Sequence, residues 1–249
     1  MLKEERQNLI LNQLHDEKKV LSSEVCKQYK VSEDTIRRDL KELASQGKLL
    51  KVHGGALVTS QNVFSYREDE IFDHDKKLTI AQKALSLIEN NDVIVLGGGT
   101  TILELANILP DDLTITVYTY SLPVAMRLAD HPRIETIFFG GRIMKKPRIT
   151  IGLDMIQYVG EIRADVCFLG ASGIDINSGL MEIDLEVAQL KNTIAKVSDR
   201  VVVLSTYEKI ETKQRFMVCR LDKITTLITE LDSNFPKLSE YRKRGLEIL

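Results

Sequence analysis

Long hydrophobic runs and closely spaced cysteines are both absent from this 249-residue sequence. No stretch approaches the ~20 consecutive apolar residues that a membrane-spanning helix needs. The first residues are charged and no apolar segment follows them, so no signal peptide is expected. Cys26, Cys167 and Cys219 form no CxxC pair and fit no zinc spacing, which predicts thiols in a reducing compartment. These absences predict a cytoplasmic protein without a membrane partner, a metal or another cofactor.

Charge is unevenly distributed along the chain, although its net charge is only −2. Residues 1–56 hold 11 basic and 9 acidic side chains, whereas residues 57–249 hold 23 basic and 27 acidic ones. A basic N-terminal part on an acidic body suits a protein that binds DNA through one end.

The first part of the chain is predicted to begin with two helices. Apolar residues recur at helical spacing from Lys3 to about Leu14. Ser22 and Ser23 offer N-caps for a short second helix that ends near Gln28.

A third helix is predicted from Ser32 to about Gln46. Ser32 is a good N-cap, and the apolar side chains of Ile36, Leu40 and Leu43 fall on one helical face. The polar side chains between them therefore lie on the other faces of the helix.

The segment after the third helix predicts a wing. Gly47 is typical of a helix stop, and residues 48–52 alternate like a short strand. A turn at 53–56 and a second strand at 57–58 complete a hairpin. Three helices and a hairpin predict a winged helix-turn-helix DNA-binding domain over residues 1–58.

The third helix carries side chains that suit base reading. Residues in the N-terminal half of a recognition helix meet base edges in the major groove. Arg37 or Arg38 can bond bidentately to guanine, and Thr35 can contact a thymine methyl group or a phosphate. Lysine and histidine in the wing suit contacts to the DNA backbone or the minor groove. The candidate DNA-binding residues are Ser22, Ser32, Thr35, Arg37, Arg38, Lys41, Lys48, Lys51, His53, Gly54 and Gly55. The alternative is a solvated charged helix face, but the order of elements favours DNA binding.

Residues 77–249 are predicted to form an α/β domain, joined to the first domain by a polar linker at 59–76 in which Phe64 and Tyr66 are expected to be anchors. Short apolar strands alternate with helices, which indicates a mostly parallel sheet covered on both faces. Strands are expected at 93–96, 114–118, 134–139, 166–169, 201–204 and 224–228, and helices at 78–89, 101–109, 123–129, 153–158 and 185–197.

The first strand of this domain runs into a glycine-rich turn, residues 97–101, and then into a helix. Glycines let a backbone approach an anion, and free N–H groups at a helix N-terminus point at it. The turn is not a P-loop, since no lysine follows, and it is not a GxGxxG dinucleotide fingerprint. It is compatible both with an anion site and with a tight strand-to-helix turn.

Two long segments resemble the DeoR/GlpR family of bacterial repressors. Residues 31–43 are similar to the family's recognition helix, and residues 47–56 are similar to its wing. In this family Asp39 would help to hold the helix, and we expect Asp39 to orient the neighbouring arginines rather than to touch DNA.

The resemblance continues through the C-terminal part to about residue 230. It implies a domain similar to the ribose-5-phosphate isomerase and glucosamine-6-phosphate deaminase fold, which senses a phosphorylated sugar whose binding weakens operator affinity. The candidate effector-binding residues are Gly97, Gly98, Gly99, Thr100, Thr101, Tyr120, Ser121, Gly141, Arg142, Gly170, Gly173, Lys191 and Lys209.

Five positions depart from the family's pattern. Gly97 stands where aspartate is common, Tyr120 where asparagine is common, and Met181 where threonine is common. Val187 and Thr206 replace expected acidic residues. Lost hydrogen-bond partners change selectivity strongly. We therefore expect an anionic, phosphorylated effector other than the family's commonest ligands.

Two other functions are compatible with parts of this pattern. A sugar-phosphate isomerase or deaminase would need an acid/base pair beside the phosphate loop. None of the four histidines lies in a predicted pocket loop, and Asp175, Glu182 and Asp184 are expected to be solvated or capping. A regulator whose C-terminal domain serves only oligomerisation or partner binding is the other alternative.

The sequence as a whole predicts a non-enzymatic regulator that binds double-stranded DNA. We expect a repressor of a carbohydrate-metabolism operon, released by a phosphorylated sugar or a related anion. Because one DNA-binding domain makes few base contacts, a homo-oligomer, dimer or tetramer, is expected.

Overall fold

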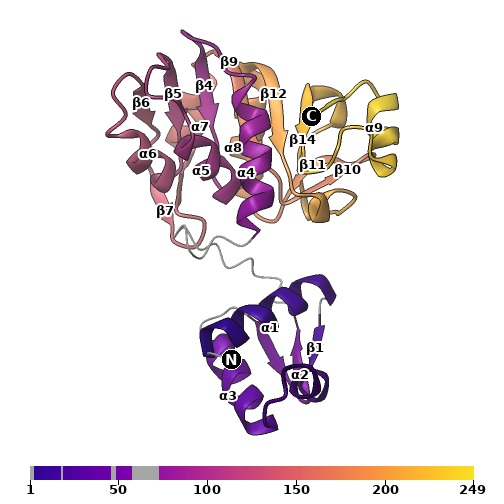
Figure 1. Ribbon diagram of the computed structural model, residues 1–249. Helices are drawn as coiled ribbons and strands as arrows, with labels where there is room; N and C mark the ends of the chain where they lie inside the picture. The colour runs from indigo at the N-terminus through magenta and orange to yellow at the C-terminus, as the bar shows by residue number, and fades with distance from the viewer. Residues whose placement is uncertain (1–2, 18, 46–48, 58–72) are drawn as a thin grey trace. The chain divides into compact units, whose positions relative to one another are not determined.

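A computed structural model describes residues 3–17, 19–45, 49–57 and 73–249 of the chain. The chain divides into two compact units, Met1–Val63 and Phe64–Leu249 (Figure 1). Among the described residues, no helix combines the length and apolar character needed to cross a membrane. The predictions for Gly47, Lys48, Phe64 and Tyr66 lie outside the described residues.

The N-terminal unit, called the head below, is a winged helix-turn-helix, as predicted. A three-stranded antiparallel sheet in the order β1-β3-β2 stands beside three helices. Its elements are α1 (Lys3–Glu17), β1 (Lys19–Leu21), α2 (Ser22–Tyr29), α3 (Glu33–Ser45), β2 (Leu50–Val52) and β3 (Gly55–Leu57).

A small apolar core holds the head together. It consists of Ile10, Leu14, Val20, Val25, Ile36, Leu40, Leu43, Leu49 and Ala56. The sequence did not predict β1, because a three-residue strand with one inward side chain, Val20, shows no readable period. The turn predicted at 53–56 is also shorter than expected, since Gly55 and Ala56 already belong to β3.

The C-terminal unit, called the body below, is built on a parallel seven-stranded sheet in the order β15-β14-β12-β9-β4-β5-β6. These strands are β4 (Val93–Leu96), β5 (Thr116–Thr119), β6 (Glu135–Phe138), β9 (Ala164–Gly170), β12 (Ser198–Leu204), β14 (Thr226–Ile228) and β15 (Glu247–Ile248). The predicted α/β class is therefore confirmed.

Helices cover both faces of this sheet (Figure 1). Ile94 and Leu96 of β4 pack with one group of helices, whereas Val95 between them packs with the other. The first group is α4 (His74–Leu85), α5 (Thr100–Asn107) and α6 (Leu122–Leu128), and the second includes α7 (Leu153–Gly160), α8 (Leu185–Val197) and α9 (Ser239–Lys243). Burial on both faces explains why the central strands are wholly apolar.

Two small antiparallel sheets complete the body. Their short strands were not predicted, because three or four residues in turn-rich segments carry little periodicity. They are the hairpin β7 (Arg142–Met144) with β8 (Ile149–Ile151), and the sheet of β10 (Gly173–Asp175), β11 (Gly179–Glu182) and β13 (Phe216–Cys219). Single 3-10 turns lie at Tyr207–Lys209, Leu221–Lys223 and Pro236–Leu238.

Helix α4 begins earlier than predicted. Its first residue is His74 rather than Leu78, so residues 74–76, which the sequence assigned to the linker, are helical.

The strand order reverses at the centre of the large sheet. From β4 the chain runs outward through β5 and β6, and it then returns to add β9 on the other side of β4. The connection after β4 leads to α5 on one face, and the connection after β9 leads towards α8 on the other. In such sheets the carboxyl ends of the two central strands border a crevice where ligands bind.

Candidate functional site

Helix α3 has one buried face and one charged, exposed face. Ile36, Leu40 and Leu43 are buried, whereas Arg37, Arg38 and Lys41 are exposed. The structure thus separates the predicted reading residues from the residues that fix the helix.

The predicted cations of the helix and the wing are brought together in the head. A hollow of about 380 Å³ is lined by Asp34, Arg37, Arg38, Lys41 and Lys51, and it is called the basic hollow below. Four cations around one concave surface favour a polyanion such as the DNA backbone. His53 and Gly54 lie exposed at the adjacent turn.

Three other predicted DNA-binding residues have structural partners. The Oγ of Ser32 accepts a hydrogen bond from the Thr35 N–H at 3.3 Å and shares one with the Thr35 hydroxyl at 2.8 Å. Ser22 donates its backbone N–H to the Gly54 carbonyl at 2.8 Å. These bonds fix the beginnings of α3 and α2, so Ser22 and Ser32 set the geometry of the reading surface. The prediction that Ser22 or Ser23 caps α2 is wrong, because both lie inside the helix and its N-cap position is Leu21.

Gly55 is a packing residue rather than an exposed contact. A Cβ atom at this position would lie 2.0 Å from the Val20 carbonyl oxygen, so only glycine allows β3 to approach β1. The prediction of Gly55 as a DNA contact is therefore wrong, since Gly55 is buried in the wing sheet.

Asp39 does not orient the neighbouring arginines, contrary to the prediction. It is buried and pairs with Arg6 of α1, with 2.5 Å between Nε and Oδ2 and 3.2 Å between Nη2 and Oδ1. Gln7 donates to the same carboxylate at 3.4 Å. Asp39 therefore ties α3 to α1 from the inside, a contact between distant segments that helix spacing alone does not show.

In the body, the glycine-rich turn follows the carboxyl end of β4 beside β9, at the reversal of strand order where sheets of this kind commonly bind ligands. The Gly97 N–H donates to the Phe168 carbonyl at 3.0 Å, which fixes the turn against β9. Gly99 is the N-cap of α5 with a φ of 115°, and no side chain of the described residues caps this N-terminus. Thr100 and Thr101 open the helix and are buried. The N-terminal N–H groups of α5 are arranged as an anion site requires.

Two predicted lysines converge on the end of β9. The Nζ of Lys191 donates to the Gly170 carbonyl at 2.6 Å and pairs with Glu182, and the Nζ of Lys209 donates to the Ala171 carbonyl at 2.9 Å. Burial acts to lower the pKa of Lys191, but the Glu182 carboxylate outweighs it and the pKa is raised. Burial lowers the pKa of Lys209, and the charge of Lys191 adds to this effect.

Lys77 of α4 is a further lysine here that the sequence did not single out. Burial lowers its pKa to about 8, and the nearby charge of Lys209 acts in the same direction. An anion would stabilise lysines whose charges disfavour each other. In the sequence Lys77 directly follows the predicted linker, and no local pattern separates it from its polar neighbours.

Three other predicted effector residues have structural contacts of their own. Arg142 is exposed on β7 and pairs with Glu186 at the beginning of α8. Gly141 and Gly173 lie against the backbone of Ile151 and Thr212, where they serve packing. Tyr120 and Ser121, in contrast, are fully buried directly after β5, which neighbours β4.

The candidate acids of an isomerase are engaged in the fold. Asp184 caps α8 by accepting the Val187 N–H at 3.2 Å, and Asp175 accepts the N–H groups of Asn177 and Ser178. Capping was predicted for both. Glu182 differs from its prediction, because it is buried in β11 and pairs with Lys191 instead of facing solvent.

His74 also differs from its predicted place in the linker. It begins α4, and its Nδ1 lies 3.4 Å from the buried carboxylate of Glu104 on α5, the helix that follows the glycine turn.

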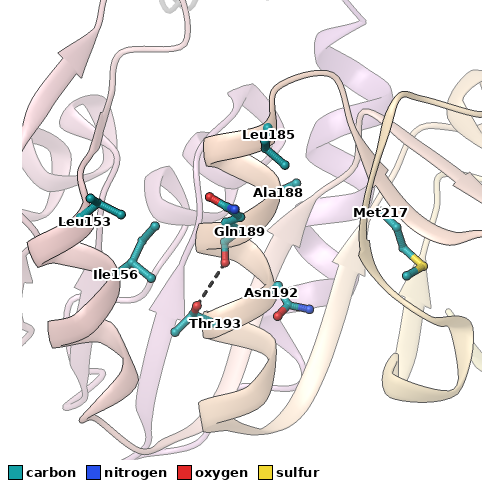
Figure 2. Close-up of a pocket in the computed structure, with 8 residues that line it drawn as sticks. All are labelled: Leu153, Ile156, Leu185, Ala188, Gln189, Asn192, Thr193 and Met217. Carbon is teal, nitrogen blue, oxygen red and sulfur yellow. Dashed lines mark hydrogen bonds between the residues drawn. The ribbon is translucent and has the colours of Figure 1, made fainter.

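A second concave surface of the body is apolar. Figure 2 shows α8 with α7 on one side and β13 on the other. The cavity measures about 390 Å³ and is called the apolar groove below; it is lined by Leu153, Ile156, Leu185, Ala188, Gln189, Asn192, Thr193 and Met217. It has no cationic side chain, so it does not suit a phosphorylated ligand.

Comparison with known protein families identifies both units. Residues 6–62 match the DeoR-like helix-turn-helix domain, and residues 73–231 match the DeoR C terminal sensor domain. The chain belongs to the DeoR family of transcriptional regulators. The resemblance seen in the recognition helix, the wing and the body is thereby confirmed.

Relatives of this DeoR-family regulator match over nearly their whole length. The HTH-type transcriptional regulator GolR of Listeria innocua is 32% identical, over 98% of this chain and 97% of the relative. The L-fucose operon activator of Escherichia coli is 31% identical, over 92% and 96%. The transcriptional repressor GlcR of Bacillus subtilis is 28% identical, over 100% and 96%.

Solved structures with a similar body include the ribose 5-phosphate isomerase A of Methanocaldococcus jannaschii. It is 21% identical, with a TM-score of 0.42 over 56% of this chain and 55% of that one.

Proposed function

We propose that this regulator represses a carbohydrate-metabolism operon and that a phosphorylated, anionic metabolite releases it from DNA. The head binds the operator through α3 and the wing, and the body binds the metabolite at the crevice between β4 and β9. It acts in the cytoplasm, where operator DNA is accessible. The proposal of DNA binding rests on the basic hollow, in which the three cations on the exposed face of α3 and Lys51 of the wing line one concave surface.

The effector half is supported by the chemistry of the crevice. An uncapped helix N-terminus follows the glycine turn. The buried Lys191 and the half-buried Lys209 bind carbonyl groups at the end of β9, where Gly170 lies against Gly98, and Lys77 lies near Lys209. Names of relatives, such as the glycerol-3-phosphate regulon repressor of Escherichia coli, agree with a phosphorylated ligand. For a ligand to release DNA it must prefer the body conformation that holds the heads in a non-binding arrangement.

A titration tests this function. Binding of the full-length protein to its own upstream DNA is measured by gel shift at fixed salt, with sugar phosphates added in series. We expect specific binding that at least one phosphorylated compound weakens. Specific binding that no phosphorylated compound changes would instead favour a body that serves only oligomerisation or partner binding.

An isomerase or deaminase function is not supported by the site. Asp175 and Asp184 bond backbone N–H groups, and Glu182 is held by Lys191 and Ser172. A general acid/base needs a carboxyl group free to exchange a proton with substrate.

Lys77 offers a pH test of the effector site. The folded chain releases the Lys77 proton near pH 8, whereas an unfolded lysine holds it up to its ordinary pKa of 10.5. The unfolded state therefore binds more protons between these values, so wild-type stability rises with pH through this window. The cost that the charged Lys77 imposes below pH 8 is on the order of 3 kcal/mol.

We expect Lys77→Met to be more stable than wild type near pH 7, with a difference in Tm that narrows from pH 8 to pH 10. Thermal unfolding of both proteins across this range measures it. A difference that stays constant with pH would contradict the assignment of Lys77 as a strained cation of the site.

The apolar groove supports the homo-oligomer that two-headed DNA recognition requires. Leu153 is 80% exposed, Met217 56% and Leu185 50%, and such clustered apolar side chains mark protein interfaces. A second copy of the chain is the proposed partner of this groove.

We expect Leu153→Glu to shift the protein from oligomer towards monomer, because a charge in an apolar interface is costly to desolvate. Light scattering after size exclusion measures the mass. Met126→Glu is the matched control, since Met126 on α6 is 75% exposed but lies outside the groove. Equal masses for both variants would contradict the proposal that the groove is the interface between copies.

A further inference from the structure

Tyr120 carries a buried hydroxyl group that donates no hydrogen bond within the part of the chain that the structure describes. The side chain is fully buried directly after β5, and among the described residues no acceptor takes the hydrogen of its hydroxyl group. The nearby Gly98 N–H can only donate to the oxygen of this hydroxyl. The Oγ of Ser121 next to it is also buried without a partner within that part of the chain. Buried hydroxyl groups in folded proteins are nearly always paired, so an unpaired one at a ligand crevice calls for an explanation.

The tyrosine ring lies over the glycine turn. A Cβ atom at Gly97 would lie 3.1 Å from the Tyr120 Oη, and one at Gly98 would lie 3.6 Å from the ring. Ile149 of β8 covers Gly98 beside the ring, where that same Cβ would be 2.7 Å from its Cγ2. Gly97 therefore makes room for Tyr120 and Gly98 makes room for Ile149, and the tyrosine ring takes up volume that a smaller residue would leave to a ligand.

The acceptors beside Lys191 and Lys209 already accept hydrogen bonds from the protein. Both oxygens of Glu182 accept hydrogen bonds, from Lys191 on one side and from Ser172 and the Ile183 N–H on the other. The carbonyl groups of residues 170 and 171 accept from Lys191 and Lys209. The Tyr120 hydroxyl and the uncapped N-terminus of α5 remain as donors, and the unpaired Ser121 hydroxyl can donate as well as accept.

A ligand that binds here therefore meets mainly donors. The hydroxyl groups of a sugar would need acceptors for their hydrogens, and leaving them unpaired is costly. A carboxylate or a phosphoryl group offers only acceptor oxygens, which match this environment.

We propose that Tyr120 determines the specificity of the effector site, donating its hydroxyl to an acceptor oxygen of a short phosphorylated carboxylic acid. The ring excludes longer polyhydroxylated sugar phosphates, and Ile149 moves aside to admit the ligand. This inference rests on the effector site proposed above, and it names the chemical class of the ligand.

The test compares four probes on the full-length protein by calorimetric titration and thermal unfolding. They are 3-phosphoglycerate, glycerol 3-phosphate of the same length without the carboxylate, glucose 6-phosphate, and inorganic phosphate. We expect 3-phosphoglycerate to bind the wild type most tightly.

Tyr120→Phe keeps the ring and removes the hydroxyl. We expect it to weaken 3-phosphoglycerate binding about tenfold and to leave inorganic phosphate unchanged. Without ligand its Tm should rise by roughly 2–4 °C, since an unpaired buried hydroxyl is lost. A purely structural tyrosine would show the opposite sign in Tm. Tyr120→Asn, which also removes the ring, should gain affinity for glucose 6-phosphate.

Tyr118→Phe is the matched control, because Tyr118 is on β5 and stacks on Phe139 at 5.4 Å. It should change neither binding nor ligand preference. The inference fails if Tyr120→Phe binds 3-phosphoglycerate like the wild type, if its Tm falls, or if the wild type prefers glucose 6-phosphate. If the wild type responds to none of the four probes while still binding its DNA, the proposed effector site fails, and this inference fails with it.

Discussion

Asp39→Ala is expected to destabilise the head by about 3–5 kcal/mol, because it leaves the Arg6 guanidinium buried without its carboxylate. The two side chains are only 3% and 10% exposed, so water cannot replace the lost partner. Small domains are stable by about 5–15 kcal/mol, so this loss removes much of the head's stability. We expect the variant to lose DNA binding while the body stays folded.

Hydrogen exchange resolved by peptide measures this effect in the full-length protein. Protection should fall in α1 and α3 of Asp39→Ala and stay unchanged in the body. Glu42→Ala is the matched control: Glu42 also joins α3 to α1, through Lys3 at 2.7 Å, but the two side chains are 39% and 55% exposed. Exposed pairs contribute roughly 0–1 kcal/mol. Equal loss of protection in both variants would contradict the role assigned to Asp39.

Arg37→Ala is expected to weaken specific operator binding by roughly 1–3 kcal/mol, or about 5- to 150-fold. The side chain is exposed on α3 and lines the basic hollow, so its loss does not disturb the core. Arg37→Lys separates base reading from charge, because lysine keeps the charge but cannot bond bidentately to guanine. We expect Arg37→Lys to lose most of the specific affinity and little of the non-specific affinity.

Gel shifts at fixed salt, with the gene's own upstream DNA and with unrelated DNA, measure both affinities. Lys223→Ala is the control, since Lys223 is an exposed cation of the body and its loss changes the net charge equally. An unchanged specific affinity in Arg37→Ala, with the head folded, would contradict the assignment of Arg37 as a residue that contacts bases.

Local patterns were enough to predict the elements that define the class of this protein. Strand β4 and helix α8 have the predicted bounds, and α3 has its predicted cap and buried face. Each of these depends on neighbours within one or two turns or on a continuous apolar run. The same holds for the glycine turn, whose place between a strand and a helix is visible in the order of residues.

What the side chains do in the effector site depended on residues far away in the chain. From local sequence Glu182 resembles a loop carboxylate, and only the fold places Lys191 beside it. Lys77 resembles its polar neighbours in the sequence, and only the fold brings it near Lys209. The contact of the buried Tyr120 with Gly97 also depends on the fold, because the two residues follow different strands, β5 and β4. Burial and charge partners set pKa and hydrogen-bond demand, and neither is contained in local spacing.

Asp39 shows the same division within a single helix. Its position on α3 was predictable from the helical period, because the period fixes which face a residue occupies. Its partner was not, since Arg6 lies 33 residues away and only the packing of α1 against α3 brings it to the carboxylate. By itself the sequence determined a DNA-reading helix and a parallel sheet with a glycine turn. The tertiary structure alone decided which charges are buried together, because electrostatic partners are chosen by packing.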